Sequence, residues 1–110
     1  MKIREGFTGQ RSLVVPQLIL DMAAEDPILQ VLHITAMGYY PKAEGHYRIR
    51  TDAIPDYVLI YCLDGGGWFE VGGRRHKVPS NSFFILPAGQ PHAYGADTYG
   101  PWTIYWVHYQ

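Results

Sequence analysis

The sequence predicts a mainly β domain, a jelly roll or closed β-barrel preceded by a short N-terminal arm and one or two short helices. From residue 32 onward, short runs rich in aromatic and β-branched residues follow one another. Glycine or proline separates these runs at intervals of about ten residues. The 110 residues, 47% of them hydrophobic, suffice for one core. We therefore expect a single domain, with the arm and helices over residues 1–31 and the barrel over residues 32–110.

The first 31 residues contain the expected arm and helices. Residues 12–15 are predicted to be extended, and Pro16 then suits the first position of a helix, where its missing N–H has no intrahelical partner. The apolar residues at helical spacing in this helix are Leu18, Ile19 and Met22. Pro27 ends the helix because the residue before a proline is disfavoured in the α region. Asp26 can also cap a second short helical turn over residues 28–31.

Eight strands are predicted after residue 31. They are residues 32–37, 46–50, 57–63, 68–71, 74–78, 82–86, 92–94 and 102–108. Gly65-Gly66-Gly67 turns the chain after the third strand, because glycine accepts the positive φ values that tight turns need. Gly72-Gly73 makes a two-residue hairpin between the fourth and fifth strands. Eight short strands with this spacing are typical of a jelly roll or barrel, which manages exposed sheet edges by doubling or closing the sheet.

Charge and cysteine content exclude several functions. Nine Lys and Arg are scattered among ten Asp and Glu, so we expect no DNA binding by this chain alone. Cys62 is the only cysteine and lies in the apolar run 57–63, which predicts a buried thiol and suits a reducing compartment. The N-terminal residues do not resemble a signal peptide, and no segment has the ~20 consecutive apolar residues of a membrane span, so we expect neither. A cytoplasmic protein with no membrane partner is expected.

Polar and apolar residues alternate along residues 46–50. His46, Arg48 and Arg50 share one face of this predicted strand, because successive side chains point to opposite faces. Tyr47 and Ile49 share the other face. One interpretation packs the apolar face into the core and leaves the polar face in water. The other sends two guanidinium groups into the barrel mouth, where they could bind vicinal hydroxyls or a carboxylate. The alternation alone leaves both open.

Two further segments contain candidate binding residues. The tight turn Pro87-Ala88-Gly89-Gln90-Pro91 leads into a strand that begins with His92, and Tyr94 lies on the same face. Near the end of the chain, Trp102 and Trp106 share a face of the last predicted strand. Two tryptophans on one face could form a stacking platform for a sugar, although core packing is the ordinary role of a tryptophan.

The number of metal ligands argues against a metalloenzyme. Metal-dependent cupins are similar in the turn before His92, but they also need a His-x-His pair and a glutamate earlier in the chain. The corresponding stretch here is His46-Tyr47-Arg48, and the glutamate position falls near Tyr57 or Val58. Arginine keeps its proton and repels a cation, and one or two imidazoles do not complete a coordination sphere. We expect no metal, no cofactor and no catalytic residue.

Four blocks resemble the N-terminal, cupin-like effector-binding domain of AraC-type bacterial transcription regulators. They are residues 39–43, 56–68, 86–95 and 101–106, and they cover nearly all of residues 33–110 in the family's order. The resemblance implies a sensor that binds a sugar, sugar acid or related metabolite in the barrel and catalyses nothing. It also implies control of DNA binding by a C-terminal helix-turn-helix part, which we expect to be absent from this chain.

The resemblance also implies site residues. Arg50, Tyr94 and Trp106 match the arginine, tyrosine and tryptophan that bind the ligand of the arabinose regulator, which favours an inward Arg50. Ile104 and Ala36 stand in place of a pocket histidine and threonine, which argues against arabinose as the ligand. The remaining candidates for the ligand-binding site are His92, Arg48, His46 and Trp102.

The family's N-terminal arm folds over the occupied pocket. Residues 7–16 correspond to this arm, and Arg11, Ser12 and Pro16 are the candidate contacts. A ligand would stabilise one arm placement only by as much as it binds that state better.

Two other functions remain as alternatives to the sensor. One is a small cupin enzyme, an isomerase or dioxygenase with a degenerate metal site, and stoichiometric metal in purified protein would reveal it. The other is a carbohydrate-binding or structural jelly roll. A homodimer, formed through the two-tryptophan face or an uncovered edge strand, is the other partnership that the sequence allows.

Overall fold

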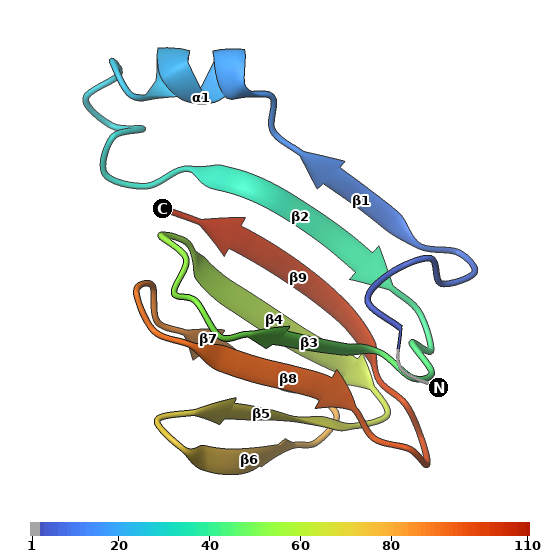
Figure 1. Ribbon diagram of the computed structural model, residues 1–110. Helices are drawn as coiled ribbons and strands as arrows, with labels where there is room; N and C mark the ends of the chain where they lie inside the picture. Colours follow the sequence, from blue (N-terminus) through green and yellow to red (C-terminus); the bar gives the residue numbers. More distant parts are fainter. Residues whose placement is uncertain (1–2) are drawn as a thin grey trace.

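The computed structural model describes residues 3–110, which form two antiparallel β-sheets packed against each other (Figure 1). One sheet has the strand order β1-β2-β9-β4-β7, and the other has the order β3-β8-β5-β6. The elements are β1 (Arg11–Val14), α1 (Gln17–Ala23), β2 (Ile34–Tyr40), β3 (Tyr47–Arg50), β4 (Tyr57–Asp64), β5 (Gly67–Val71), β6 (Arg74–Val78), β7 (Ser82–Leu86), β8 (His92–Ala96) and β9 (Thr103–Tyr109). The predicted mainly β architecture is confirmed.

The predicted arm is a strand of the larger sheet. β1 pairs with β2 in an antiparallel register that runs from Arg11 opposite Tyr39 to Val14 opposite Ala36. β2 accordingly continues to Tyr40, beyond the predicted end at residue 37. The expected boundary between residues 31 and 32 lies in the turn before β2, but the sheet itself begins with β1.

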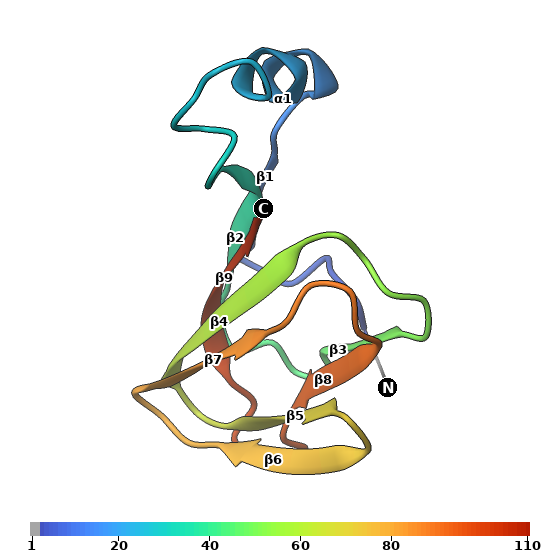
Figure 2. The same ribbon diagram turned by 90° about the vertical axis from the view of Figure 1, so that its left-hand side faces the viewer.

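The predicted helix exists but makes little contact with the core. It begins after Pro16, whose ψ of 146° is not helical, and Ala23 is its one buried residue. Residues 28–31 form turns rather than a second helix, although Asp26 caps them as predicted: its Oδ1 accepts the N–H of Ile28 at 2.9 Å and that of Leu29 at 3.1 Å. Figure 2 shows α1 projecting beyond the end of the two sheets. No helix in residues 3–110 has the length and apolar character needed to cross a membrane.

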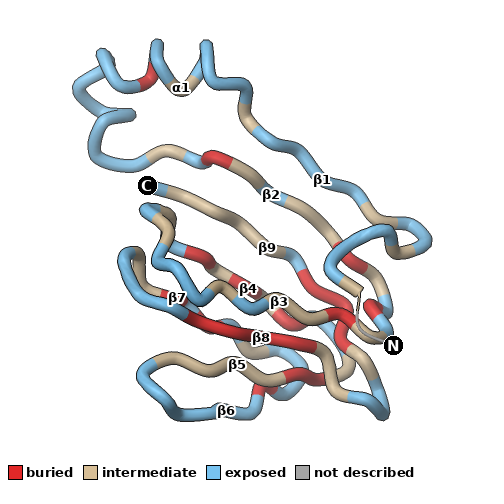
Figure 3. The backbone as a smooth tube through the Cα atoms, in the orientation of Figure 1, coloured by how far each residue is buried: buried red, intermediate tan, exposed pale blue. Residues whose placement is uncertain are grey.

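The hydrophobic core lies between the sheets, and Figure 3 shows its buried residues gathered on β4, β8 and β9. Trp102 is 0% exposed and packs over Gly67, where a Cβ atom would overlap the indole ring. The Phe84 ring stacks with both Phe69 and Trp102. Cys62 is buried, as predicted. This packing fills one part of the interior with side chains.

The N-terminal segment connects the edges of the two sheets. Ile3 pairs with His46 next to β3, the edge strand of the smaller sheet, and its carbonyl accepts the N–H of Tyr47 at 3.0 Å. Eight residues later the chain enters β1, the edge strand of the larger sheet. Residues 3–14 therefore run from the β3 edge of the smaller sheet to the β1 edge of the larger sheet.

Candidate ligand-binding site

A cavity of about 210 Å³ lies between the sheets, beside the packed core. Both sheets and the N-terminal segment contribute to its wall. The lining residues are Arg4, Glu5, Ser12, Val14, Ala36, Tyr40, His46, Arg48, Arg50, Tyr94, Ile104, Trp106 and His108. The cationic groups of the interior come from β3, and most of the apolar wall comes from β1, β2 and β9.

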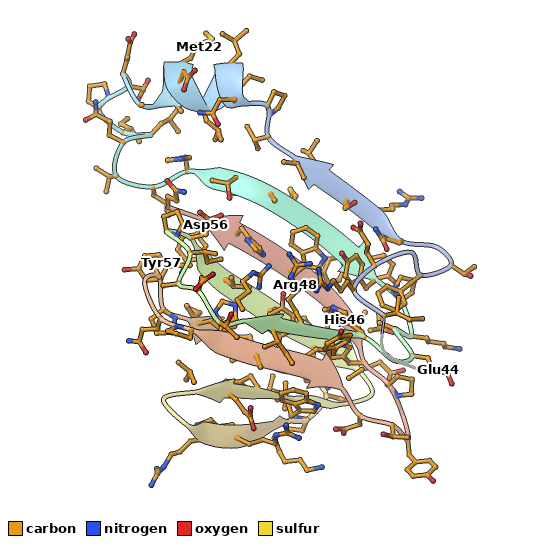
Figure 4. The ribbon with its side chains drawn as sticks, viewed as in Figure 1. Met22, Glu44, His46, Arg48, Asp56 and Tyr57 are labelled. Carbon is orange, nitrogen blue, oxygen red and sulfur yellow. The ribbon has the colours of Figure 1, made fainter. Side chains whose placement is uncertain are left out.

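The polar face of β3 points inward. Arg48 and Arg50 line the cavity, whereas Ile49 between them is 53% exposed on the outside. Figure 4 shows Arg48 and His46 near each other along β3, in the space between the sheets. This choice of face is physically reasonable because the two guanidinium groups reach an accessible cavity rather than the dry core, so they are only partly desolvated.

Arg50 is held in place by two residues of β8. Its Nη1 lies 2.9 Å from Nε2 of His92 and donates to the Tyr94 hydroxyl at 3.2 Å. Because arginine only donates hydrogen bonds, Nε2 of His92 must be the acceptor and carries no proton. Burial, together with the charge of Arg50, lowers the pKa of His92 to about 4, so the imidazole is neutral near pH 7. His92 does not line the cavity and instead positions Arg50.

His46 lines the cavity and also contacts the core residue Trp102. The indole N–H of Trp102 donates to its Nδ1 at 3.1 Å, so a neutral His46 carries its proton on Nε2. Burial first, and the nearby charge of Arg48 second, lower the pKa of His46 to about 4. Trp102 itself is fully buried and absent from the cavity wall. The predicted two-tryptophan platform is therefore wrong, because only Trp106 reaches the cavity.

His108 lies on the opposite wall and contacts an acidic group. Its Nδ1 is 3.5 Å from Oδ2 of Asp56, which also accepts the hydroxyl of Thr35 at 2.7 Å. Burial is the largest influence on His108 and lowers its pKa, with the Arg50 charge acting in the same direction and Asp56 in the opposite one.

Of the three arm residues that were predicted to contact the ligand, the structure brings one to the cavity. Ser12 lines the cavity, whereas Arg11 and Pro16 do not. Successive residues of β1 point to opposite faces, which directs Arg11 away from the cavity, and Pro16 lies beyond the end of the strand.

Several lining residues were not selected from the sequence. His108 lies two residues after Trp106 in the predicted last strand, so the two share a face, whereas Tyr40 lies beyond the predicted end of its strand at residue 37. Arg4 and Glu5 had no such pattern, because they reach the cavity only through the pairing of Ile3 with His46.

The donor set does not fit a metal ion. Across residues 3–110 there is no group of three or more His, Cys, Asp or Glu side chains that could hold one. Nε2 of His92 already accepts from Arg50, and Nδ1 of His46 accepts from Trp102. The guanidinium groups of Arg48 and Arg50 would also repel a cation bound beside these imidazoles.

Comparison with known sequences gives a consistent result. The sequence pattern described as the AraC-like ligand binding domain matches residues 33–110. The MmsAB operon regulatory protein of Pseudomonas aeruginosa is 35% identical over 100 residues, which cover 87% of this chain and 32% of that protein. The raffinose operon transcriptional regulatory protein RafR of Pediococcus pentosaceus is 33% identical over 64 residues, which cover 56% of this chain and 23% of that protein. The chain thus spans less than a third of the length of these relatives.

The fold has relatives among solved structures. A cupin superfamily protein from Desulfitobacterium hafniense DCB-2 aligns with a TM-score of 0.56 at 13% identity. The alignment covers 96% of this chain and 81% of that one. At this identity the likeness concerns the fold alone, and it confirms the predicted cupin-like jelly roll.

Proposed function

Because this chain belongs to the AraC-like ligand-binding domain family, we propose that it is the small-molecule sensor of a bacterial transcription regulator and catalyses no reaction. The observation that carries the proposal is the cavity between the sheets, whose wall contains Arg50, Tyr94 and Trp106. A few directed polar groups among apolar walls are typical of small-molecule binding sites.

We assign a role to each candidate residue from its position. Arg50 and Tyr94 bind the polar part of the ligand, and Trp106 packs against its apolar part. Arg48 and His46 supply further hydrogen-bond donors from the same side of the cavity. Two candidates act from behind the wall, since His92 fixes the guanidinium of Arg50 and Trp102 fixes His46.

The N-terminal segment is the proposed lid. Arg4, Glu5 and Ser12 all line the cavity, and residues 3–14 connect the edges of the two sheets over it. A ligand that contacts this segment stabilises the closed arrangement and shifts the population toward it. Regulation would follow if the closed and open arrangements present different surfaces to the rest of the regulator.

DNA binding belongs, in this proposal, to parts of the parent protein outside residues 33–110. The names of the two relatives describe them as operon regulators. The chain's own charges are balanced, which supports a sensory role rather than direct contact with DNA. As part of a regulator it would work in the cytoplasm, and a homodimer would use an edge strand, because Trp102 is buried.

A thermal-shift screen tests the sensor proposal. The chain is mixed with sugars, sugar acids and small organic acids, and the unfolding midpoint is measured. A ligand present at one hundred times its dissociation constant adds about 2.7 kcal/mol, which raises the midpoint by roughly ten degrees in a domain of this size.

Substitutions locate any binding that the screen detects. Arg50→Gln and Trp106→Ala should each abolish the shift, whereas Arg74→Gln, on the exposed β6 strand away from the cavity, should preserve it. A screen with no shift at all, or a shift that survives Arg50→Gln and Trp106→Ala, would contradict the proposal.

A further inference from the structure

We propose that the ligand of this cavity is a small carboxylic acid, bound as its carboxylate by Arg48 and Arg50, rather than a neutral sugar. The inference rests on the proposed sensor function and specifies the chemistry of its ligand. Three properties of the cavity carry it: its charge, the direction of its hydrogen bonds and its size.

The charges of the cavity wall do not cancel. The wall contains three arginines and one acidic residue. Glu5 offsets one of the three positive charges, and the two half-buried arginines are Arg48 and Arg50, whereas Arg4 and Glu5 are exposed. Within residues 3–110, neither interior arginine lies within 4 Å of a carboxylate; the recorded ion pairs are Arg75 with Glu70 and His108 with Asp56. Two half-buried guanidinium groups side by side favour an anion between them.

Arg50 presents a free edge of its guanidinium group. Nη1 uses its two hydrogens on His92 and Tyr94. The remaining donors are Nε and Nη2, for which no partner is recorded among the described residues. These two nitrogens form the planar edge that pairs with both oxygens of one carboxylate. The contacts of β8 therefore orient Arg50 for bidentate binding.

The other polar groups on this side of the cavity also donate. The Tyr94 oxygen accepts from Arg50, so its own hydrogen is available to a ligand. His46 carries its proton on Nε2, because Nδ1 accepts from Trp102. A carboxylate, which only accepts, complements this set of donors. A neutral sugar that bound on this side would leave any hydroxyl hydrogen that does not reach the acceptors elsewhere on the wall, such as Glu5 and Ser12, without a partner, at a cost of about 1–3 kcal/mol each.

The size and the opposite wall limit the rest of the ligand. A cavity of about 210 Å³ suits a small molecule. Across from β3, the apolar part of the wall is formed by Val14, Ala36 and Ile104, together with the Trp106 ring, and the polar side chains of Ser12, Tyr40 and His108 complete it. A short hydrocarbon chain or ring attached to the carboxylate would pack against this apolar part of the wall.

Matched ligand pairs test this inference by isothermal titration calorimetry at neutral pH. The probes are butyrate, lactate, hexanoate and benzoate, and each is compared with its own amide. Arabinose, glucose and inorganic phosphate are the remaining probes. We expect at least one carboxylate to bind, and its amide to bind at least about tenfold more weakly, because the charge-assisted pair is lost. Inorganic phosphate should bind more weakly than that carboxylate.

Substitutions at Arg48 test the site. Arg48→Gln should weaken carboxylate binding by about 10- to 100-fold, and Arg48→Lys should restore part of the affinity because it keeps the charge. Arg74→Gln is the matched control and should change nothing. If Arg48→Gln does not fold, the affinities of each acid and its amide for the wild-type chain and for Arg48→Lys still test the inference.

The outcomes separate this inference from the proposed function. Equal affinity for acid and amide, binding of a sugar or phosphate in preference to every carboxylate, or unchanged carboxylate affinity in a folded Arg48→Gln variant overturns the carboxylate inference. If a neutral sugar binds and Arg50→Gln abolishes its binding, the sensor proposal stands without it. If no probe binds, and no compound in the thermal-shift screen does either, both are overturned.

Discussion

Individual residues of this chain act in pairs, one facing the cavity and the other supporting it from behind. Arg50 lines the cavity and His92 accepts its hydrogen bond; His46 lines the cavity and accepts from Trp102. In each pair the supporting residue is buried, so its position is fixed by packing. A side chain held in this way loses less conformational freedom when a ligand binds.

The first prediction concerns the support of Arg50. Replacing His92 by Leu removes the acceptor but keeps an apolar group of similar size, so the domain should fold while Arg50 loses its orientation. The ligand found in the screens should bind about 5- to 20-fold more weakly, as expected for the loss of one charge-assisted hydrogen bond. Calorimetric titration measures this change. His76→Leu, at an exposed histidine, is the control, and equal affinities in both variants would refute a positioning role for His92.

The second prediction concerns Gly38, which lies opposite Trp106 in the pairing of β2 with β9. A Cβ atom at Gly38 would overlap the indole ring, so Gly38→Ala should push Trp106 into the cavity. We expect weaker ligand binding and a changed tryptophan fluorescence spectrum. Gly67→Ala is the comparison, because its Cβ would overlap the core residue Trp102 and should chiefly lower the free energy of unfolding, by about 1–3 kcal/mol. A Gly38→Ala variant with wild-type affinity would show that Trp106 does not shape the site.

At the scale of elements, the N-terminal segment has two attachments. Residues 11–14 form an edge strand, and Ile3 pairs with His46 beside the other sheet. The few residues between these attachments place Arg4 and Glu5 on the cavity wall. One attachment can therefore be removed while the other remains.

The third prediction uses this separation. Deleting residues 1–9 removes the attachment at His46 but keeps β1 and so protects the edge of β2. If the segment is a lid, the ligand should dissociate faster, and its affinity should fall by about 5- to 10-fold, since changes in affinity appear mainly in dissociation rates. Stopped-flow measurement of the dissociation rate provides the test. The double substitution Arg4→Gln and Glu5→Gln distinguishes loss of the lid from loss of two side chains, and an unchanged rate in the truncated chain would exclude the lid.

At the scale of the whole molecule, two buried and neutral histidines make the stability of the fold depend on pH. The pKa of His46 and that of His92 are both lowered to about 4, by burial first and by a nearby arginine second. Between pH 6.5 and pH 4 the unfolded chain therefore binds protons that the folded chain does not. Their contribution to stability is fully present above pH 6.5 and is lost as the pH falls toward 4.

The fourth prediction follows from this sign. Lowering the pH from about 7 to about 4.5 should reduce the free energy of unfolding, and His46 alone should account for roughly 3 kcal/mol of the loss by about pH 4. Urea unfolding at several pH values measures it. His46→Gln, which can still accept from Trp102, should show a shallower dependence on pH, whereas His76→Gln should follow the wild type. Parallel curves for His46→Gln and the wild type would contradict the prediction.

The sequence by itself determined the mainly β class and most of the strands after residue 31, because these depend on local residue type and on alternation along the chain, but it did not show that the N-terminal arm is a strand of the larger sheet. It also placed Arg48 and Arg50 on one face of β3 and named Tyr94 and Trp106 as candidates. Only the tertiary structure decided which face of β3 points inward, since alternation defines two faces without saying which one the second sheet covers. It likewise separated Trp102 in the core from Trp106 at the cavity, and brought Arg4 and Glu5 to the cavity wall. These outcomes depend on contacts between segments far apart in the chain, such as Ile3 with His46, which no local pattern encodes.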